Sequence, residues 1–159
     1  MLKANKSPAR QRPPSGGHFA IVASSYNARF VDSMVKAAAK TLKAAGAETV
    51  EIVRVPGAFE IPVIASTLAS RTNPRVSAIL CLGVILRGAT THAQHIGESV
   101  TQALVSIQVQ RQIPVIHEVL LLENPEQARQ RCLDPKHNRG VEAARTALDM
   151  ARILLQIQT

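Results

Sequence analysis

The sequence predicts one α/β domain, a three-layer α/β/α sandwich built around a four-stranded parallel sheet. Four apolar runs suited to buried strands alternate along the chain with segments whose apolar residues recur at helical spacing. Strands that alternate with helices are joined by right-handed crossovers, which makes the sheet parallel and covers both of its faces. A length of 159 residues, with 46% hydrophobic and 19% charged residues, suits a single compact domain, which we expect over residues 18–159.

The first strand is predicted over His18–Ser24 (HFAIVAS), a run of small and β-branched residues that follows Gly16-Gly17. After a loop at residues 25–27, apolar residues recur at helical spacing until Gly46, which favours the end of a helix. These positions are Phe30, Val31, Met34, Val35, Ala38 and Leu42. The segment therefore forms a first strand-helix unit.

The second and third strands are predicted over Thr49–Val55 and residues 77–86. Pro56-Gly57 closes the second strand, and a helix over Ile61–Ala69 follows with Pro62 in its first turn, where proline is tolerated. The third strand is apolar on both faces, as expected in the middle of a parallel sheet.

The last third of the chain predicts three helices and one strand. A helix begins near His92 and ends before Pro114, and the fourth strand covers Val115–Leu122. The buried side of that helix is expected to carry Ile96, Val100, Leu104, Ile107 and Gln108. Asn124-Pro125-Glu126-Gln127 is a helix start with a capping side chain and proline at the first position, and a final helix covers residues 139–157.

The composition excludes several functions. No apolar run approaches the roughly 20 residues that cross a membrane. Residues 1–17 lack the apolar segment of a secretory signal and predict a flexible, solvated basic tail; binding of this tail to RNA is the weaker alternative, because no aromatic residues are interleaved with the four cations. Cys81 and Cys132 show no metal-type spacing with the histidines, and they favour a reducing compartment, the cytoplasm.

Residues 82–95 (LGVILRGATTHAQH) have the order strand, small-residue loop, helix start, which is typical of an anion site in α/β proteins. Gly88 and Ala89 let the backbone approach a ligand, and His92 would stand beside it as a group that exchanges protons near neutral pH. The alternative is an ordinary turn with a capping threonine and a solvated histidine. The loops at residues 25–27, 56–60 and 87–92 and the segment after Leu122 should meet at one sheet edge, because ligands bind beyond the carboxyl ends of parallel strands.

Four stretches in this order resemble lumazine synthase, the 6,7-dimethyl-8-ribityllumazine synthase family of riboflavin biosynthesis. They are VPGAFEIP (55–62), LGVILRGATTH (82–92), PEQARQR (125–131) and HNRGVEAARTALDM (137–150). The resemblance implies a flavodoxin-like fold. It also implies condensation of 5-amino-6-(D-ribitylamino)uracil with 3,4-dihydroxy-2-butanone 4-phosphate, without a cofactor or metal.

The resemblance also implies roles for individual residues. His92 falls on the catalytic histidine, Tyr26 on the aromatic platform for the pyrimidine, where phenylalanine is commoner, and Arg131 on the charged phosphate clamp. Glu142 falls where the family often has an acid that orients the histidine. Further substrate contacts fall on Ala58, Phe59, Glu60, Val84, Ile85 and Leu86 for the pyrimidine and ribityl chain, and on Ala89 and Thr90 for the phosphate.

Taken from the residues alone, some of these positions have simpler interpretations. Glu60 suits a first-turn acid that complements a helix dipole, Arg131 a solvated cation at a helix end, and Phe59 a core residue. Three positions depart from the family. His117 replaces the usual aromatic residue and can still stack on a pyrimidine, but it titrates; Glu118 stands where glycine is common; and residues 93–95 read Ala-Gln-His instead of aromatic-acid-aromatic, so that His95 adds a second titrating group.

In the family the site lies between subunits, with the counterparts of His117 and Arg131 supplied by a neighbour. This implies a homo-pentamer at least, and some pentamers assemble into hollow sixty-subunit shells. The link between Arg131 and Gly140 has no insertion, which favours a shell. The alternative function is a non-catalytic flavin-binding or pterin-binding protein on the same scaffold.

Overall fold

The structure, a computed structural model, describes residues 16–158. It contains a four-stranded, fully parallel sheet with the strand order β2-β1-β3-β4. The strands are β1 (His18–Ser24), β2 (Thr49–Val55), β3 (Ala78–Leu86) and β4 (Val115–Leu122). The predicted strands are confirmed, with the third beginning at Ala78 instead of Ser77. The expected basic tail lies, up to residue 15, outside the described residues.

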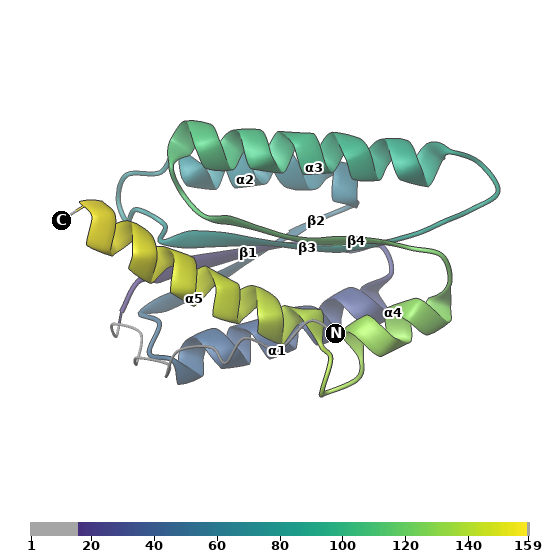
Figure 1. The fold of residues 1–159 in the computed structure, drawn as a ribbon, viewed down its shortest axis with the longest axis horizontal. Helices are drawn as coiled ribbons and strands as arrows, with labels where there is room; N and C mark the ends of the chain where they lie inside the picture. The colour runs from purple at the N-terminus through teal and green to yellow at the C-terminus, as the bar shows by residue number, and fades with distance from the viewer. Residues whose placement is uncertain (1–15, 159) are drawn as a thin grey trace, which may run out of the picture.

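Helices cover both faces of the sheet, which confirms the three-layer sandwich (Figure 1). The elements α2 and α3 lie on one face, and α1, α4 and α5 lie on the other (Figure 1). Their bounds are α1 (Ala28–Ala44), the 3-10 turn η1 (Ala58–Glu60), α2 (Ile61–Ala69), α3 (His92–Arg111), α4 (Pro125–Cys132) and α5 (Arg139–Gln158).

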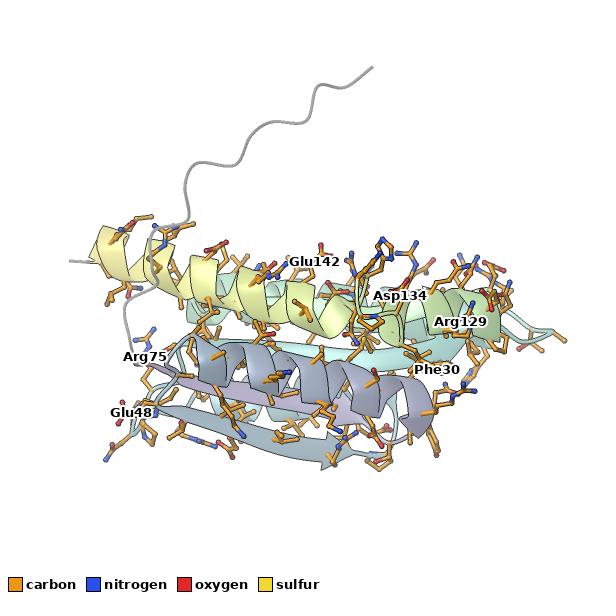
Figure 2. The ribbon with its side chains drawn as sticks, turned by 90° about the horizontal axis from the view of Figure 1, so that it is seen from below. Phe30, Glu48, Arg75, Arg129, Asp134 and Glu142 are labelled. Atoms are coloured by element: carbon orange, nitrogen blue, oxygen red, sulfur yellow. The ribbon has the colours of Figure 1, made fainter. Side chains whose placement is uncertain are left out.

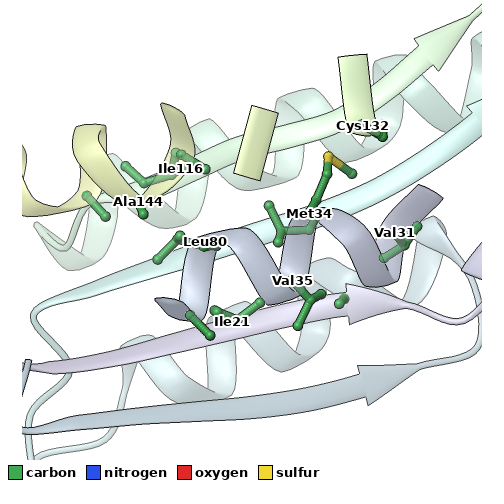
Figure 3. Close-up of a cluster of buried hydrophobic side chains, with 14 of the residues drawn as sticks. Ile21, Val31, Met34, Val35, Leu80, Ile116, Cys132 and Ala144 are labelled. Atoms are coloured by element: carbon green, nitrogen blue, oxygen red, sulfur yellow. The ribbon is translucent and has the colours of Figure 1, made fainter. Parts of the chain in front are cut away.

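Two apolar cores, one on each face of the sheet, explain the continuous apolar strands. Alternate residues of β1 point to opposite faces, so Ile21 joins the core below the sheet while Val22 joins the core above it. Figure 3 shows the lower core, where Met34 of α1 lies among side chains of the sheet, α4 and α5. Met34 is fully buried, and burial of such a side chain contributes roughly 1.5–3 kcal/mol.

Side-chain caps fix the starts of α4 and α5. The Asn124 Oδ1 accepts a hydrogen bond from the Gln127 N–H at 2.9 Å, as the sequence predicted. The start of α5 is held by Asn138, a buried residue that the sequence analysis did not single out. Its Oδ1 accepts from the Gly140 N–H at 2.8 Å, and its Nδ2 donates to the Cys132 carbonyl at 2.6 Å. Asn138 therefore links α5 to the end of α4.

The helices α1 and α5 are in close contact at Gly140. A Cβ atom added at this glycine would clash with the carbonyl oxygen of Met34 in α1. Because that obstacle is backbone, no change of rotamer can remove it. The two helices can therefore pack at this distance only around a glycine.

Within residues 16–158, no helix is both long and apolar enough to cross a membrane.

Candidate active site

A cleft of about 740 Å³ lies at the carboxyl end of the sheet, where the loops after β1, β2 and β3 meet. It is lined by Tyr26, Asn27, Gly57, Ala58, Phe59, Glu60, Val84, Ile85, Leu86, His92, His95, Ile96 and Ser99. In Figure 1, this is the end of the molecule at which α3 and α4 begin. The structure thus brings together most of the residues that the sequence assigned to the site.

The wall after β1 is shaped by Asn27, which the sequence analysis did not single out as a site residue. Asn27 adopts a left-handed conformation with φ of 57°, which asparagine tolerates better than most residues. Its Nδ2 donates to the Val84 carbonyl at 2.7 Å and so ties this loop to the end of β3. The adjacent Tyr26 is 68% exposed, so its ring is available to a ligand in the cleft.

The wall after β2 is the turn that includes η1. The Gly57 N–H donates to the Glu60 Oε2 at 3.0 Å, so this carboxylate holds its own turn closed. A Cβ at Gly57 would lie 2.9 Å from the Tyr26 ring, which means that the two walls touch here. Phe59 is 63% exposed, so interpretation of this residue as core packing is wrong.

The floor of the cleft is formed by the last three residues of β3. Val84 is buried, while Ile85 and Leu86 are half-buried and face the cleft. Apolar side chains here suit a flat heterocycle, which needs an apolar surface against which to stack.

His92 is the first residue of α3 and lies exposed on the cleft wall. Of the two threonines before the helix, Thr91 makes no side-chain capping hydrogen bond, and the capping threonine of the simpler interpretation is Thr90. The His92 N–H instead donates to the Thr90 Oγ1 at 3.4 Å. The amino end of a helix 20 residues long therefore faces solvent beside an imidazole, which is a suitable arrangement for an anion.

The loop between β3 and α3, residues 87–91, is the predicted anion loop, and it is exposed to solvent. Ala89 and Thr90 are exposed but do not line the cleft of the single chain. His95, one turn after His92, does line it, and its Nε2 lies 3.3 Å from the Thr91 Oγ1. Two imidazoles therefore share this wall.

Arg131 lies on the other face of the sheet, in a second pocket of about 580 Å³ between α4 and α5. Figure 2 looks onto this face of the molecule, with Asp134 and Glu142 labelled. The Glu142 carboxylate accepts from Arg139 at 2.8 Å. One chain alone therefore does not bring Arg131 or Glu142 to His92.

His117, on β4, also lies outside the cleft, under α3. Its Nδ1 accepts from the Val119 N–H at 3.1 Å, which leaves its Nε2–H to donate to the Thr101 Oγ1 at 2.7 Å. The Thr101 hydroxyl in turn donates to the Gly97 carbonyl at 2.7 Å. This chain of bonds requires a neutral imidazole, and burial lowers the pKa of His117 in agreement. At the position where the family usually has an aromatic residue, this chain therefore has a neutral imidazole.

A prediction about pH follows from His117. Because its pKa is lower in the folded chain than in the unfolded chain, the unfolded chain binds the proton more readily. Stability is therefore full above the ordinary histidine pKa of about 6.5 and falls as the pH drops below it. We expect His117→Phe to reduce the loss of melting temperature between pH 7.5 and pH 5.5.

The matched control is His137→Gln, because His137 is exposed and its ring only pairs with Asp134 at 3.0 Å on the other face. Thermal unfolding of the three proteins at both pH values makes the comparison. An unchanged pH response in His117→Phe would show that His117 does not carry this proton.

The two cysteines are unsuited to thiol chemistry. Cys81 is fully buried, and burial raises its thiol pKa. Burial, reinforced by the charge of Glu118, raises the pKa of Cys132 to about 11. Neither forms a thiolate near neutral pH, because the thiolate would have to be desolvated. Among residues 16–158, no three His, Cys, Asp or Glu side chains gather as metal ligands.

Comparisons with known proteins agree on one family. The sequence profile of 6,7-dimethyl-8-ribityllumazine synthase matches residues 16–154. The chain is 38% identical over 143 residues to the protein of that name from Xylella fastidiosa (strain 9a5c), covering 89% of this chain and 92% of the relative. It is 38% identical over 148 residues to the one from Stenotrophomonas maltophilia (strain R551-3), covering 92% and 94%. Another, from Xanthomonas oryzae pv. oryzae (strain PXO99A), is 37% identical over 145 residues, with 90% and 92% covered.

Proposed function

The chain belongs to the 6,7-dimethyl-8-ribityllumazine synthase family, and from this premise we propose how its residues carry out the reaction. The enzyme condenses 5-amino-6-(D-ribitylamino)uracil with 3,4-dihydroxy-2-butanone 4-phosphate. The product is 6,7-dimethyl-8-ribityllumazine, formed with release of phosphate and water in the penultimate step of riboflavin biosynthesis. The observation that carries the assignment of the site is the cleft in which Tyr26, Phe59 and the end of β3 surround His92.

The pyrimidine is proposed to bind against the floor of this cleft. The Tyr26 ring supplies a stacking surface, and Ala58, Phe59 and Glu60 follow the ribityl chain along the η1 wall. The exposed rings of Tyr26 and Phe59 support this placement, because each can be covered by a ligand without any rearrangement of the core.

His92 is proposed to move the protons of the reaction. The 5-amino group attacks the ketone to form an imine, phosphate then leaves, and the ring closes with loss of water. Each step needs a proton delivered to or taken from carbon, nitrogen or oxygen, so one well-placed imidazole can serve several of them. Binding both substrates side by side supplies much of the remaining rate.

The phosphate group is proposed to bind between the anion loop at Ala89 and Thr90 and the guanidinium of Arg131 from a neighbouring subunit. Two observations support a shared site. Arg131 and Glu142 lie on the face opposite His92, and Arg131 forms no ion pair with any residue in the described range 16–158. A guanidinium matches the oxygens of a phosphate in bidentate geometry.

We expect Arg131→Ala to raise the KM for the phosphorylated ketone at least about tenfold while kcat changes less, because the guanidinium binds the phosphate before and during the reaction. Initial rates at varied ketone concentration measure this. Arg129→Ala is the matched control, because Arg129 is on the same helix but is already paired with Glu126 at 2.7 Å. Equal KM values for the wild type and Arg131→Ala would remove Arg131 from the site.

A homo-pentamer is proposed as the smallest active assembly, since it would place Arg131 and His117 of one subunit at the cleft of the next. Exposed apolar side chains support burial of α3 in the assembly: Val105 is 52% and Val109 is 69% exposed. We also propose that the pentamers assemble into a sixty-subunit shell, because the link between α4 and α5 is short. The free, buried cysteines Cys81 and Cys132 support a reducing compartment, the cytoplasm.

A direct assay tests the function: the purified chain is mixed with both substrates, and the absorbance and fluorescence of the lumazine are followed over time. Lumazine formation well above the rate without protein is expected. Tight binding of a flavin or pterin without turnover would instead indicate a non-catalytic binding protein, which the matched relatives do not favour.

A further inference from the structure

Glu118 is a buried carboxylate for which the proposed mechanism has no role. It lies on β4 with its side chain toward α5, on the face that also carries Ile116 and Leu120. Only 5% of the residue is exposed. A charged group at such a position is costly unless it is paired, so its partner is informative.

That partner is Arg139, the first residue of α5. The Arg139 Nε and Nη2 donate to the two carboxylate oxygens of Glu118, both at 3.0 Å. The remaining Nη1 donates to the Glu142 Oε2 at 2.8 Å. The bidentate geometry is the strongest that a guanidinium and a carboxylate can form, and here it points the fork of Arg139 into the fold.

Arg139 lines the pocket that contains Arg131, and Glu118 lies behind it in the fold. Four cations line that pocket, namely Arg131, Lys136, Arg139 and Arg145. Arg139 differs from the other three because a buried carboxylate accepts hydrogen bonds from its Nε and Nη2. Burial raises the pKa of Glu118, and the hydrogen bonds and charge of Arg139 oppose that shift. Arg139 therefore favours the ionised form of Glu118, which burial alone would disfavour.

We propose that Glu118 lowers the phosphate affinity of this pocket by engaging the Nε and Nη2 of Arg139, so that Arg131 and Arg145, which form no ion pair within residues 16–158, are the guanidiniums left to meet the phosphate group. The inference rests on the proposed function in taking phosphate as the ligand of the pocket. A pocket in which the Arg139 guanidinium was free as well would bind phosphate more tightly, and the phosphate released in the reaction would leave more slowly. Glu118 is accordingly a positioning residue, which changes the phosphate affinity through Arg139 and does not touch the substrate.

The test is the binding of inorganic phosphate to the full-length, assembled protein, measured by calorimetry at low ionic strength without either substrate. Glu118→Gln keeps the side-chain volume and removes the charge. It should bind phosphate about threefold to tenfold more tightly than the wild type, since one unit of negative charge near the pocket is lost and Arg139 keeps an ion pair only with Glu142.

The double variant Glu118→Gln with Arg139→Gln should return to the wild-type affinity, because both members of the neutral pair are then removed. Glu126→Gln is the charge-matched control. It removes an exposed carboxylate that pairs with Arg129 outside the pocket, and it should leave phosphate binding unchanged.

The inference is overturned if Glu118→Gln binds phosphate no more tightly than the wild type, or if tighter binding persists in the double variant. Should Glu118→Gln fail to assemble, Glu118→Leu takes its place with the same expected result, because leucine suits the apolar surroundings of Ile116 and Leu120. Phosphate binding needs no turnover. Loss of the proposed function would appear separately, as absence of lumazine formation by the wild type.

Discussion

His92→Ala should lower kcat by roughly a hundredfold to ten-thousandfold, the usual contribution of a general acid-base group. Binding of the ribitylaminouracil should be nearly intact, because the proposed pyrimidine contacts come from Tyr26, η1 and the end of β3 and not from the imidazole. Steady-state rates give the first quantity, and titration of the variant with the uracil alone gives the second.

His95→Gln is the comparison that distinguishes the two imidazoles on this wall. Both histidines line the cleft, but only His92 stands at the first position of α3, beside the open anion loop. We therefore expect His95→Gln to retain most of its turnover. Full activity in His92→Ala, or its loss in His95→Gln alone, would reassign the proton transfers.

The sheet was predictable because its strands are short segments rich in β-branched and apolar residues, and the central strands β1 and β3 are buried on both faces. His18–Ser24, Thr49–Val55 and Val115–Leu122 have the predicted bounds, although the edge strand Thr49–Val55 is largely exposed. The start of α4 was predictable for a different reason. Its cap is local, so Asn124, Pro125 and Gln127 carry the whole signal within four consecutive positions.

The cleft was predictable from topology, since the carboxyl ends of parallel strands share one edge. Its fine structure was not. The bond from Asn27 to the Val84 carbonyl joins residues on different loops, and the burial of Glu118 depends on an arginine 21 positions away. The partner of the His117 Nε2 is Thr101 in another element. Such contacts have no periodicity that a sequence could reveal, because their partners meet only after folding.

Gly140→Ala should destabilise the folded chain by about 3 kcal/mol or more, which corresponds to a fall in melting temperature of at least about 6 °C. Alanine is the better helix former by about 1 kcal/mol, so propensity alone predicts the opposite sign. The clash decides the result, because the added Cβ meets the Met34 carbonyl and can be relieved only if α1 and α5 separate. Thermal unfolding measures the change.

Gly88→Ala is the matched control for this prediction. A Cβ at Gly88 meets no atom within 4 Å, so the same substitution there should leave the melting temperature almost unchanged.

Gly140→Ala should also affect the substrate-binding site. Separation of α5 from α1 would displace Arg139, which begins α5, and with it the pocket wall that Arg139 and Glu142 line. Gly140→Ala should therefore also raise the KM for the phosphorylated ketone at temperatures below unfolding. A stable Gly140→Ala protein with wild-type kinetics would show that the two helices can separate here without effect on the site.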